Sequence, residues 1–436
     1  MCVNLSTCFA SGEAVILNRD VREWSNMTIT RLFASIASTY PSRTAVIAGQ
    51  ESINYAQLDD ASNRIAHLLL SEGVRLGSPV VLLVDRSIHA IIGMLGIIKS
   101  GAYYVPIEWM DTDIEQTLEK IGGSVILTTS HISSLIGSSE TKVLVIDAQY
   151  PMATKVMLDP DISESSLVYT IFTSGSSGVA KGVQITHANL LHYSLSLMKQ
   201  LSIAQPLNYA FVSSFSTDLG NTCIYLSLLS GGCLHLVDQD TRRDPRRFQL
   251  YLGRNDIDVL KITPSHFTAL FGHYLYLDQI SLEFLIFGGE KLRIEIVKSA
   301  LECKLARTIV NHYGPTETTI GASCYVVTSI DQIPLQAKSV PIGWPIGQTD
   351  LRLLDSTGQC VSVEGNGELF IGGPSVARGY YNNEQLTAER FIEMDLDAQG
   401  LKRYYRTGDL CYRYKNGCLE FLGRCDRQIK VRGFRV

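Results

Sequence analysis

The sequence predicts an α/β fold of several subdomains, with a smaller antiparallel β-barrel toward the C-terminal end. Three observations predict it. The chain has 436 residues, more than one hydrophobic core usually serves. Strand-like and helix-like segments alternate through most of it, which is typical of a parallel sheet covered by helices on both faces. From about residue 323, short strands separated by glycines replace that alternation, which indicates an antiparallel sheet or small barrel.

The elements follow in order along the chain. Residues 1–26 are polar and without a regular period, so we expect a leader or linker there. An amphipathic helix begins at Thr28 and stops before Pro41, because the residue ahead of a proline disfavours helical backbone. The expected elements after it are a strand at Thr44–Ala48, a helix at Tyr55–Glu72, a strand at Pro79–Val84, a helix at Ile88–Ser100, and strands at Ser124–Thr128, Lys142–Asp147, Ala210–Ser214, Cys233–Val237, Val259–Thr263, Leu282–Phe287, Asp350–Leu354, Gly367–Gly372, Leu410–Tyr414 and Leu419–Phe421.

Composition is that of a globular protein and excludes two classes of partner. Hydrophobic residues make up 45% of the chain and charged residues 19%, which is too apolar for disorder. The net charge of -5 disfavours a nucleic-acid partner, since a polyanion needs a basic surface. There is no secretory signal pattern, and the longest apolar run, Ala90–Ile98, is about half a bilayer span. We expect a soluble cytoplasmic protein without a membrane partner.

The ten cysteines contain no C-x-x-C pair, so the spacing predicts neither a zinc knuckle nor a thioredoxin-like motif. Cys411, Cys418 and Cys425 recur at intervals of seven residues. Because the segments between them alternate like strands, we expect buried free thiols and not metal ligands.

A glycine-rich loop is the strongest local signal. An apolar strand runs into Thr173-Ser174-Gly175-Ser176-Ser177-Gly178-Val179-Ala180-Lys181-Gly182. Its backbone N–H groups, hydroxyls and lysine can surround one anion, which indicates phosphate binding. The loop is not a Walker motif, because Ala180 precedes the lysine and Gly182 follows it. The alternative is a flexible Gly/Ser linker, which the apolar flanks disfavour.

With this loop the sequence resembles the adenylate-forming enzyme superfamily, whose loop reads T-S-G-[ST]-[ST]-G-x-P-K-G; Ala180 stands where proline is usual. Four further segments match in the family's order: Asn311-His312-Tyr313-Gly314-Pro315-Thr316-Glu317-Thr318, Gly367-Glu368-Leu369 through Arg378-Gly379-Tyr380, Tyr405-Arg406-Thr407-Gly408-Asp409 and Gly423-Arg424-Cys425-Asp426-Arg427-Gln428-Ile429-Lys430. The segment Lys99-Ser100-Gly101-Ala102-Tyr103-Tyr104-Val105-Pro106 favours the adenylation domains of non-ribosomal peptide synthetases. The resemblance implies an αβαβα core with two mixed or parallel sheets at 27–325, a distorted β-barrel at 326–424 and a hinge at 425–436.

The resemblance also implies a site for ATP and Mg²⁺. Tyr313 would stack on adenine, and Asn311 would meet the amino edge of the base. Asp409 can accept from both ribose hydroxyls, and Glu317 would hold Mg²⁺, which prefers oxygen ligands. The implied catalytic residues are Lys181, Thr316 and Glu317; the other nucleotide contacts are Thr173, Ser174, Gly175, Ser176, Ser177, Gly178, Gly314, Phe421 and Arg424, and Asp426 marks the hinge.

An amino-acid pocket is implied around Asp218, whose carboxylate would meet the α-ammonium. The alternative is that Asp218 caps a helix beginning near Leu219, since aspartate is a good cap. Small and hydrogen-bonding positions favour a short polar substrate and resemble pockets selecting aspartate or asparagine. Those pockets carry lysine where this chain has Ser265, so a side-chain carboxylate would depend on His312, unless that histidine is a packing residue. The pocket positions are Asp218, Leu219, Thr222, Ser265, Ile286, Gly288, His312, Ile320 and Gly321.

The reaction implied is attack of the amino-acid carboxylate on the α-phosphorus of ATP, with pyrophosphate leaving. The product would be loaded onto the phosphopantetheine thiol of a carrier-protein domain, beside other synthetase domains. Because the chain ends at Val436, we expect a core without its lid domain. Such a core should adenylate its substrate slowly. Two alternatives stay open: an acyl- or aryl-CoA ligase of the same fold, which has no use for Asp218, and a non-catalytic docking module of a synthetase.

Overall fold

The structure is a computed structural model that describes residues 26–109, 121, 125–136, 141–148, 161–173, 180–272, 280–397, 400–425, 430–431 and 434–435. Residues 1–25 of the expected leader, the phosphate-loop residues Ser174, Gly175, Ser176, Ser177 and Gly178, and the hinge residue Asp426 lie outside the described residues.

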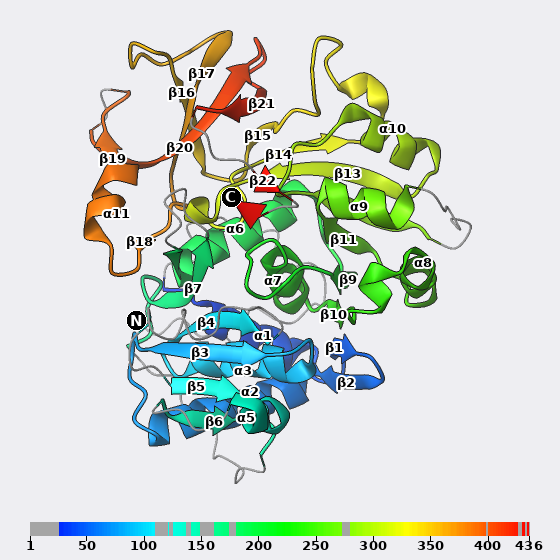
Figure 1. Ribbon diagram of the computed structural model, residues 1–436, viewed down its shortest axis with the longest axis vertical. Coiled ribbons are helices and arrows are strands. Elements are labelled where there is room, and N and C mark those ends of the chain that lie inside the picture. Colours follow the sequence, from blue (N-terminus) through cyan, green and yellow to red (C-terminus); the bar gives the residue numbers. More distant parts are fainter. Residues whose placement is uncertain are drawn as a thin grey trace.

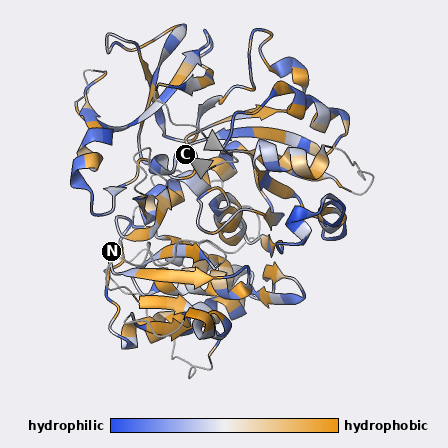
Figure 2. Ribbon diagram, in the orientation of Figure 1, coloured by the Kyte–Doolittle hydropathy of each residue, from blue (hydrophilic) through white to orange (hydrophobic). Residues whose placement is uncertain are grey.

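A seven-stranded sheet forms the lower layer of the molecule in Figure 1. Its strand order is β18-β8-β7-β4-β3-β5-β6, and its central strands are parallel. The central strands β3 and β4 are apolar along nearly all of their length, as strands covered on both faces must be, and the exception is Glu108 at the end of β4 (Figure 2). The bounds are β3 Pro79–Val84, β4 Tyr103–Glu108, β5 Val125–Thr128, β6 Val143–Val145, β7 Leu167–Thr173, β8 Lys181–Thr186 and β18 Gly379–Tyr380.

A nine-stranded sheet lies above it, in the order β15-β14-β13-β12-β11-β9-β10-β1-β2. Strands β1, β10, β9, β11, β12 and β13 run parallel, while β2, β14 and β15 are antiparallel additions at the edges. The bounds are β1 Thr44–Ala48, β2 Glu51–Asn54, β9 Asn208–Phe211, β10 Cys233–Leu236, β11 Val259–Ile262, β12 Leu282–Phe287, β13 Ala306–Tyr313, β14 Ser323–Val327 and β15 Trp344–Pro345.

Helices fill the space between the two sheets and cover the outer faces. The largest buried cluster joins strands of both sheets to five helices: α1 Ile29–Thr39, α2 Tyr55–Ser71, α3 Ile88–Lys99, α6 His187–Gln200 and α7 Asn221–Ser230. A second cluster packs α8 Pro245–Arg254, α9 Pro264–Phe271 and α10 Ile294–Glu302 against the nine-stranded sheet. Shorter helices are α5 Ser130–Ile136, α11 Glu384–Arg390, η3 Thr241–Arg243, η5 Thr316–Thr318 and η6 Ile330–Gln332.

A five-stranded antiparallel sheet forms the third body, at the upper left of Figure 1. It consists of β16 Asp350–Leu354, β17 Gly365–Gly372, β19 Phe391–Met394, β20 Lys402–Arg413 and β21 Leu419–Arg424, and a two-stranded pair follows at β22 Lys430–Val431 and β23 Phe434–Arg435. Its apolar inner face packs on Tyr313 and Ala322 of the core. The domain boundary at 325/326 stays a prediction; β15 and β18 lie beyond it in sequence yet pair with the two core sheets.

The predicted α/β fold with a smaller antiparallel sheet is confirmed. The strands at β1, β3, β12 and β16 match the expected bounds, and Thr28 caps α1 by accepting from the Arg31 backbone N–H. The expected strand at Leu410–Tyr414 is wrong in extent, because β20 begins at Lys402. Cys411 and Cys418 are buried as expected, whereas Cys425 is exposed, so the expectation of a buried thiol is wrong there.

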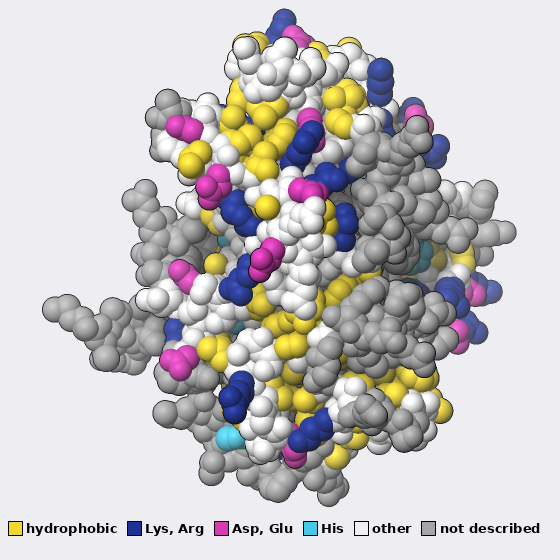
Figure 3. Space-filling model, turned by 60° about the vertical axis from the view of Figure 1, so that its left-hand side comes forward, with side chains coloured by type: hydrophobic (Ala, Val, Ile, Leu, Met, Phe, Trp, Pro, Cys, Tyr) yellow, Lys and Arg dark blue, Asp and Glu magenta, His cyan; other side chains and the backbone are white. Residues whose placement is uncertain are grey.

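Two further observations concern the surface. No helix among the described residues is long and apolar enough to cross a bilayer. On the face that Figure 3 shows, lysine and arginine side chains are interspersed with aspartate and glutamate side chains and do not form one continuous basic area.

Candidate active site

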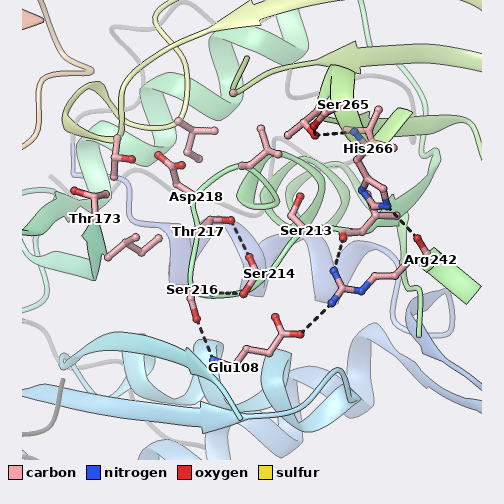
Figure 4. A pocket seen from close by; sticks show the side chains of 18 of the residues that line it. Glu108, Thr173, Ser213, Ser214, Ser216, Thr217, Asp218, Arg242, Ser265 and His266 are labelled. Carbon is pink, nitrogen blue, oxygen red and sulfur yellow. Dashed lines mark hydrogen bonds and ion pairs between the residues drawn. The ribbon is translucent and has the colours of Figure 1, made fainter. Parts of the chain in front are cut away.

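One cavity of about 850 Å³ brings together residues of both predicted sites. It lies at the carboxyl ends of parallel strands from the two large sheets, where open α/β folds bind ligands (Figure 4). Of the residues singled out in the sequence, its wall contains Thr173, Asp218, Leu219, Ser265, His312, Gly314, Thr316 and Ile320.

Asp218 lies in the loop between β9 and α7, on the cavity wall near Thr173 in Figure 4. Helix α7 begins at Asn221, and its N-cap is Gly220. Asp218 is therefore not at the capping position, and the alternative reading of this residue as a helix cap is wrong. The loop instead presents a carboxylate to the cavity.

A buried cation, Lys261, stands where sequence reasoning expected none. Its Nζ donates to Thr222 Oγ1 at 2.6 Å and to His312 Nδ1 at 3.3 Å. Lys261 is 1% exposed, and burial lowers the pKa of its ammonium to about 8, although Asp218 favours the charged form. Lys261 is not among the residues that line the cavity, but it contacts His312, which is, so the expectation that no cation adjoins the pocket is wrong. The sequence signal was a single lysine within the otherwise apolar strand β11.

His312 is both packed and part of the cavity wall. Because an ammonium group only donates, Nδ1 must accept from Lys261, so Nε2 carries the proton toward the Tyr193 hydroxyl at 3.1 Å. The Tyr193 hydroxyl in turn lies 2.6 Å from Thr222 Oγ1. Burial, together with the charge of Lys261, lowers the pKa of His312 well below its usual value. This network therefore contains one cation held by neutral partners.

Glycines make room around this network. A Cβ on Gly288 would lie 3.1 Å from Leu219 and 3.4 Å from Lys261, and a Cβ on Gly321 would overlap the His312 ring. Ile320, with φ at 68°, holds a left-handed conformation that a β-branched residue rarely adopts. Ile286 is fully buried on β12, directly beside Lys261 on β11.

Ser265 lines the same cavity but faces a different group. Its hydroxyl donates to Glu290 Oε1 at 2.6 Å, and its backbone N–H donates to Oε2 of the same carboxylate at 2.9 Å. In Figure 4 it lies beside His266, on the far side of the cavity from Asp218. Lys261, not Ser265, adjoins Thr222 and His312.

The predicted nucleotide residues form a second hydrogen-bonded group, between β13 and the antiparallel sheet. Asp409 accepts from the Tyr313 hydroxyl at 2.5 Å through Oδ2 and from Arg424 Nη1 at 2.7 Å through Oδ1. The ring of Tyr313 lies 6.3 Å from that of Phe421. Asn311, on the same strand as Tyr313, donates its amide to the Val340 and Pro341 carbonyl oxygens at 2.9 and 2.8 Å. The carboxylate predicted to bind ribose thus already bridges two of the other predicted residues.

Glu317 and Lys181, two of the predicted catalytic residues, both contact Tyr380. Glu317 is 1% exposed and accepts from the Tyr380 hydroxyl at 2.8 Å. Lys181 Nζ lies 5.8 Å from the centre of the Tyr380 ring, and the Thr173 hydroxyl lies 3.5 Å from the Lys181 carbonyl oxygen. The carboxylate of Glu317 and the hydroxyl of Thr316 are oxygen donors, which suits a hard cation such as Mg²⁺. The described part of the chain contains no group of three or more acidic, histidine or cysteine side chains that could hold a metal ion.

Comparison with known families tests the resemblance to the adenylate-forming superfamily. The model for the AMP-binding enzyme family matches residues 33–381. The chain belongs to the AMP-binding enzyme family. That match spans the phosphate loop, the cavity and the Tyr313–Glu317 segment of this AMP-binding enzyme, so the resemblance in the sequence is confirmed.

The curated relatives include subunits of peptide synthases, each much longer than this chain. Over 420 residues the chain is 35% identical to one of the linear gramicidin synthase subunits of Brevibacillus parabrevis, covering 94% of this chain and 8% of that protein. It is 33% identical over 436 residues to surfactin synthase subunit 2 of Bacillus subtilis (strain 168), covering 98% of this chain and 12% of that protein. The chain thus spans only a small part of the relatives it matches.

Solved structures share the fold of this AMP-binding enzyme. An artificially fused adenylation–PCP di-domain, NpsA-ThdA from Klebsiella oxytoca, matches with a TM-score of 0.82 at 23% identity, covering 94% of this chain and 82% of that chain. The N-terminal subdomain of NpsA from the same organism, solved with 3-hydroxybenzoyl-AMSN, matches with a TM-score of 0.79 at 23% identity, covering 91% of this chain and all of the other.

Proposed function

We propose that this AMP-binding enzyme activates aspartate, or a closely similar short polar amino acid, as its acyl-adenylate at the expense of ATP. The proposal rests on two protein groups of opposite charge at one end of the cavity. Asp218 supplies an anion on the cavity wall, and Lys261 supplies a cation buried beside Thr222 and His312. An α-ammonium at the first and a side-chain carboxylate at the second would match both charges.

The electrostatics of Lys261 favour an acidic side chain. The groups that it contacts directly, Thr222 and His312, are neutral, and its pKa of about 8 reflects the cost of burying the ammonium. A carboxylate brought into contact would offset that cost, because buried charges are stable when they are paired and hydrogen-bonded. An apolar side chain would leave the cation and two hydrogen-bonding groups without a ligand partner, which costs binding.

The cavity limits the size of that side chain. Leu219 and Lys261 already lie within van der Waals contact of a Cβ added at Gly288, and the His312 ring occupies the space beside Gly321. A four-carbon amino acid therefore suits the space better than an aromatic one. The proposed substrate pocket comprises Asp218, Leu219, Thr222, Lys261, Ile286, Gly288, His312, Ile320 and Gly321.

In the proposed reaction a carboxylate oxygen of the amino acid bonds to the α-phosphorus of ATP, and the bond from that phosphorus to pyrophosphate breaks. The chain would act by bringing two anions together and offsetting their charge. Thr173 and Thr316 would donate to phosphate oxygens, Lys181 would supply a positive charge, and Glu317 would hold Mg²⁺. Tyr313 and Asp409 would bind the adenosine.

The product would be passed to a carrier-protein thiol. The relatives are parts of much longer peptide synthases, and one similar structure is titled an adenylation–PCP di-domain. We therefore propose a carrier domain that bears phosphopantetheine, together with neighbouring synthetase domains, as partners of this chain.

Amino-acid-dependent ATP–pyrophosphate exchange with the intact protein tests the proposal. The panel holds aspartate, asparagine, glutamate, serine and phenylalanine. We expect aspartate to give the highest kcat/KM, and glutamate, which is longer by one methylene group, to give less. Highest exchange with phenylalanine, or with an acid that lacks an amino group, would contradict the proposed pocket.

A further inference from the structure

The loop that carries Asp218 packs against a buried cluster of charged side chains. Glu108, the last residue of β4, forms an ion pair with Arg86 at 3.0 Å. It also lies 3.9 Å from Arg242, as Figure 4 shows. Arg86 follows β3, the parallel neighbour of β4, so the two charges stand at adjacent strand ends. Arg242 belongs to η3, on the nine-stranded side. The cluster therefore joins the two large sheets across the cavity floor.

Each member of this cluster also bonds the loop between β9 and α7. Glu108 Oε2 accepts from the Phe215 backbone N–H at 3.2 Å, and the Glu108 N–H donates to Ser216 Oγ at 3.1 Å. Arg86 donates to the Ser213 carbonyl oxygen, and Arg242 donates to the Val212 carbonyl oxygen at 3.3 Å. The cluster thus holds the loop at several positions shortly before Asp218.

The loop has little regular structure of its own. Strand β9 ends at Phe211 and α7 begins at Asn221, so residues 212–219 lie outside any strand or helix. Within the loop, Ser214 Oγ accepts from the Ser216 N–H at 3.1 Å. Stacking of Phe211 on Phe215, with ring centres 4.6 Å apart, packs the loop on the strand before it. The charged bonds to Glu108 supply an anchor from the opposite sheet.

We propose that Glu108 is a positioning residue for amino-acid recognition: it fixes the 212–217 loop so that Asp218 faces the α-ammonium. This inference rests on the proposed function, because it needs Asp218 to bind the substrate. Glu108 itself is 6% exposed, and its carboxylate is already engaged by Arg86 and the Phe215 N–H. Its effect on substrate therefore passes through the loop.

Glu108→Gln and Ser216→Ala test the proposal, with Asp350→Asn as the matched control. The amide that replaces the Glu108 carboxylate keeps an acceptor but loses the ion pair, and Ser216→Ala removes one hydroxyl with little risk to folding. Asp350 also accepts from an arginine and from one further donor, Arg352 Nε and the Tyr404 hydroxyl, both at 2.7 Å, but in the antiparallel sheet.

We expect Glu108→Gln to raise KM for aspartate about tenfold, because it loses a charged hydrogen bond. Ser216→Ala should raise it about threefold, because it loses a neutral one. KM for ATP should stay within about twofold in both, and Asp350→Asn should change neither constant. A parallel rise of both constants, or an unchanged KM for aspartate in both variants, would overturn the proposal.

Hydrogen–deuterium exchange separates this inference from the proposed function. In Glu108→Gln the backbone amides of 212–217 should exchange faster than in the wild type, with or without substrate. Unchanged exchange there overturns the positioning role whatever the substrate is. Faster exchange in a protein that activates no amino acid would support the loop anchor and reject the proposed function.

Discussion

Replacing Lys261 by methionine should make the protein more stable and less able to use aspartate. The ammonium of Lys261 is fully buried among neutral hydrogen-bonding partners. Methionine has nearly the same length and carries no charge, so Lys261→Met removes the buried cation while filling the same space. The substitution therefore separates the stability cost of the cation from its role in binding.

The magnitude follows from the pKa. Burial lowers the pKa of Lys261 from 10.5 to about 8, and each pKa unit corresponds to 1.36 kcal/mol, so holding the charged form costs about 3 kcal/mol. The lost hydrogen bonds to Thr222 and His312 offset about 1–2 kcal/mol of this. We expect Lys261→Met to raise the free energy of unfolding at pH 7 by about 1–2 kcal/mol. Because the folded pKa is the lower one, the cost is complete below pH 8 and disappears as the pH approaches 10.5.

Urea unfolding at pH 7 and pH 10 measures the stability, and ATP–pyrophosphate exchange measures the function. We expect kcat/KM for aspartate to fall at least about 100-fold, since an ion pair with the substrate is lost, and that for asparagine to fall less. Lys99→Met is the matched control. Lys99 is also 1% exposed and burial lowers its pKa too, but its Nζ pairs with Asp59 at 2.7 Å and donates to Ser62 and Asn63. Lys99→Met leaves these acceptors unpaired, so it should destabilise the protein and leave KM for aspartate unchanged.

A destabilised Lys261→Met variant, or one that keeps its preference for aspartate, would refute this reasoning. The first result would mean that the cation is compensated within the protein. The second would mean that it does not meet the side chain of the substrate.

Three further predictions concern the same site. KM for aspartate should rise as the pH increases through about 8, because Lys261 loses its proton there, and Lys261→Arg should remove that rise. An identical pH profile in both proteins would contradict the role of Lys261 in binding the substrate side chain. Asp218→Ala should cost about 3–5 kcal/mol of transition-state binding and so lower kcat/KM for aspartate about 10²–10⁴-fold, while an ATP-induced shift in melting temperature persists. Activity that survives the change would favour an acyl-CoA ligase. Tyr380→Phe should raise the Mg²⁺ concentration needed for half-maximal ATP-induced stabilisation by about tenfold, because the Glu317 carboxylate loses its hydroxyl donor at 2.8 Å. A thermal-shift titration measures that concentration, and an unchanged value would place the metal elsewhere.

The sequence predicted the core strands well because their signal is local. Strands such as Pro79–Val84 are runs of apolar residues that need burial on both faces, and α1 begins where the side chain of Thr28 caps it. Strand β20 was predicted too short. Its first half carries Lys402 and Arg403, and Gly408, with φ at 72°, interrupts the pattern.

Site residues that lie within sequence motifs were predicted individually. Site residues that only the fold brings together were predicted less well. Lys261 was overlooked, and Ser265 was taken in its place, because a single lysine within the apolar strand β11 is a weak signal. The structure instead shows which side chain of β11 meets Thr222. The bridge from Tyr313 through Asp409 joins residues 96 apart, and such a contact depends on how the antiparallel sheet docks on the core.

The most direct test is a crystal structure with a non-hydrolysable aspartyl-adenylate analogue. We expect the α-ammonium at Asp218, the side-chain carboxylate within hydrogen-bonding distance of Lys261 Nζ, and the adenine against the ring of Tyr313. An analogue whose side chain points away from Lys261, or one bound outside the cavity, would contradict this expectation.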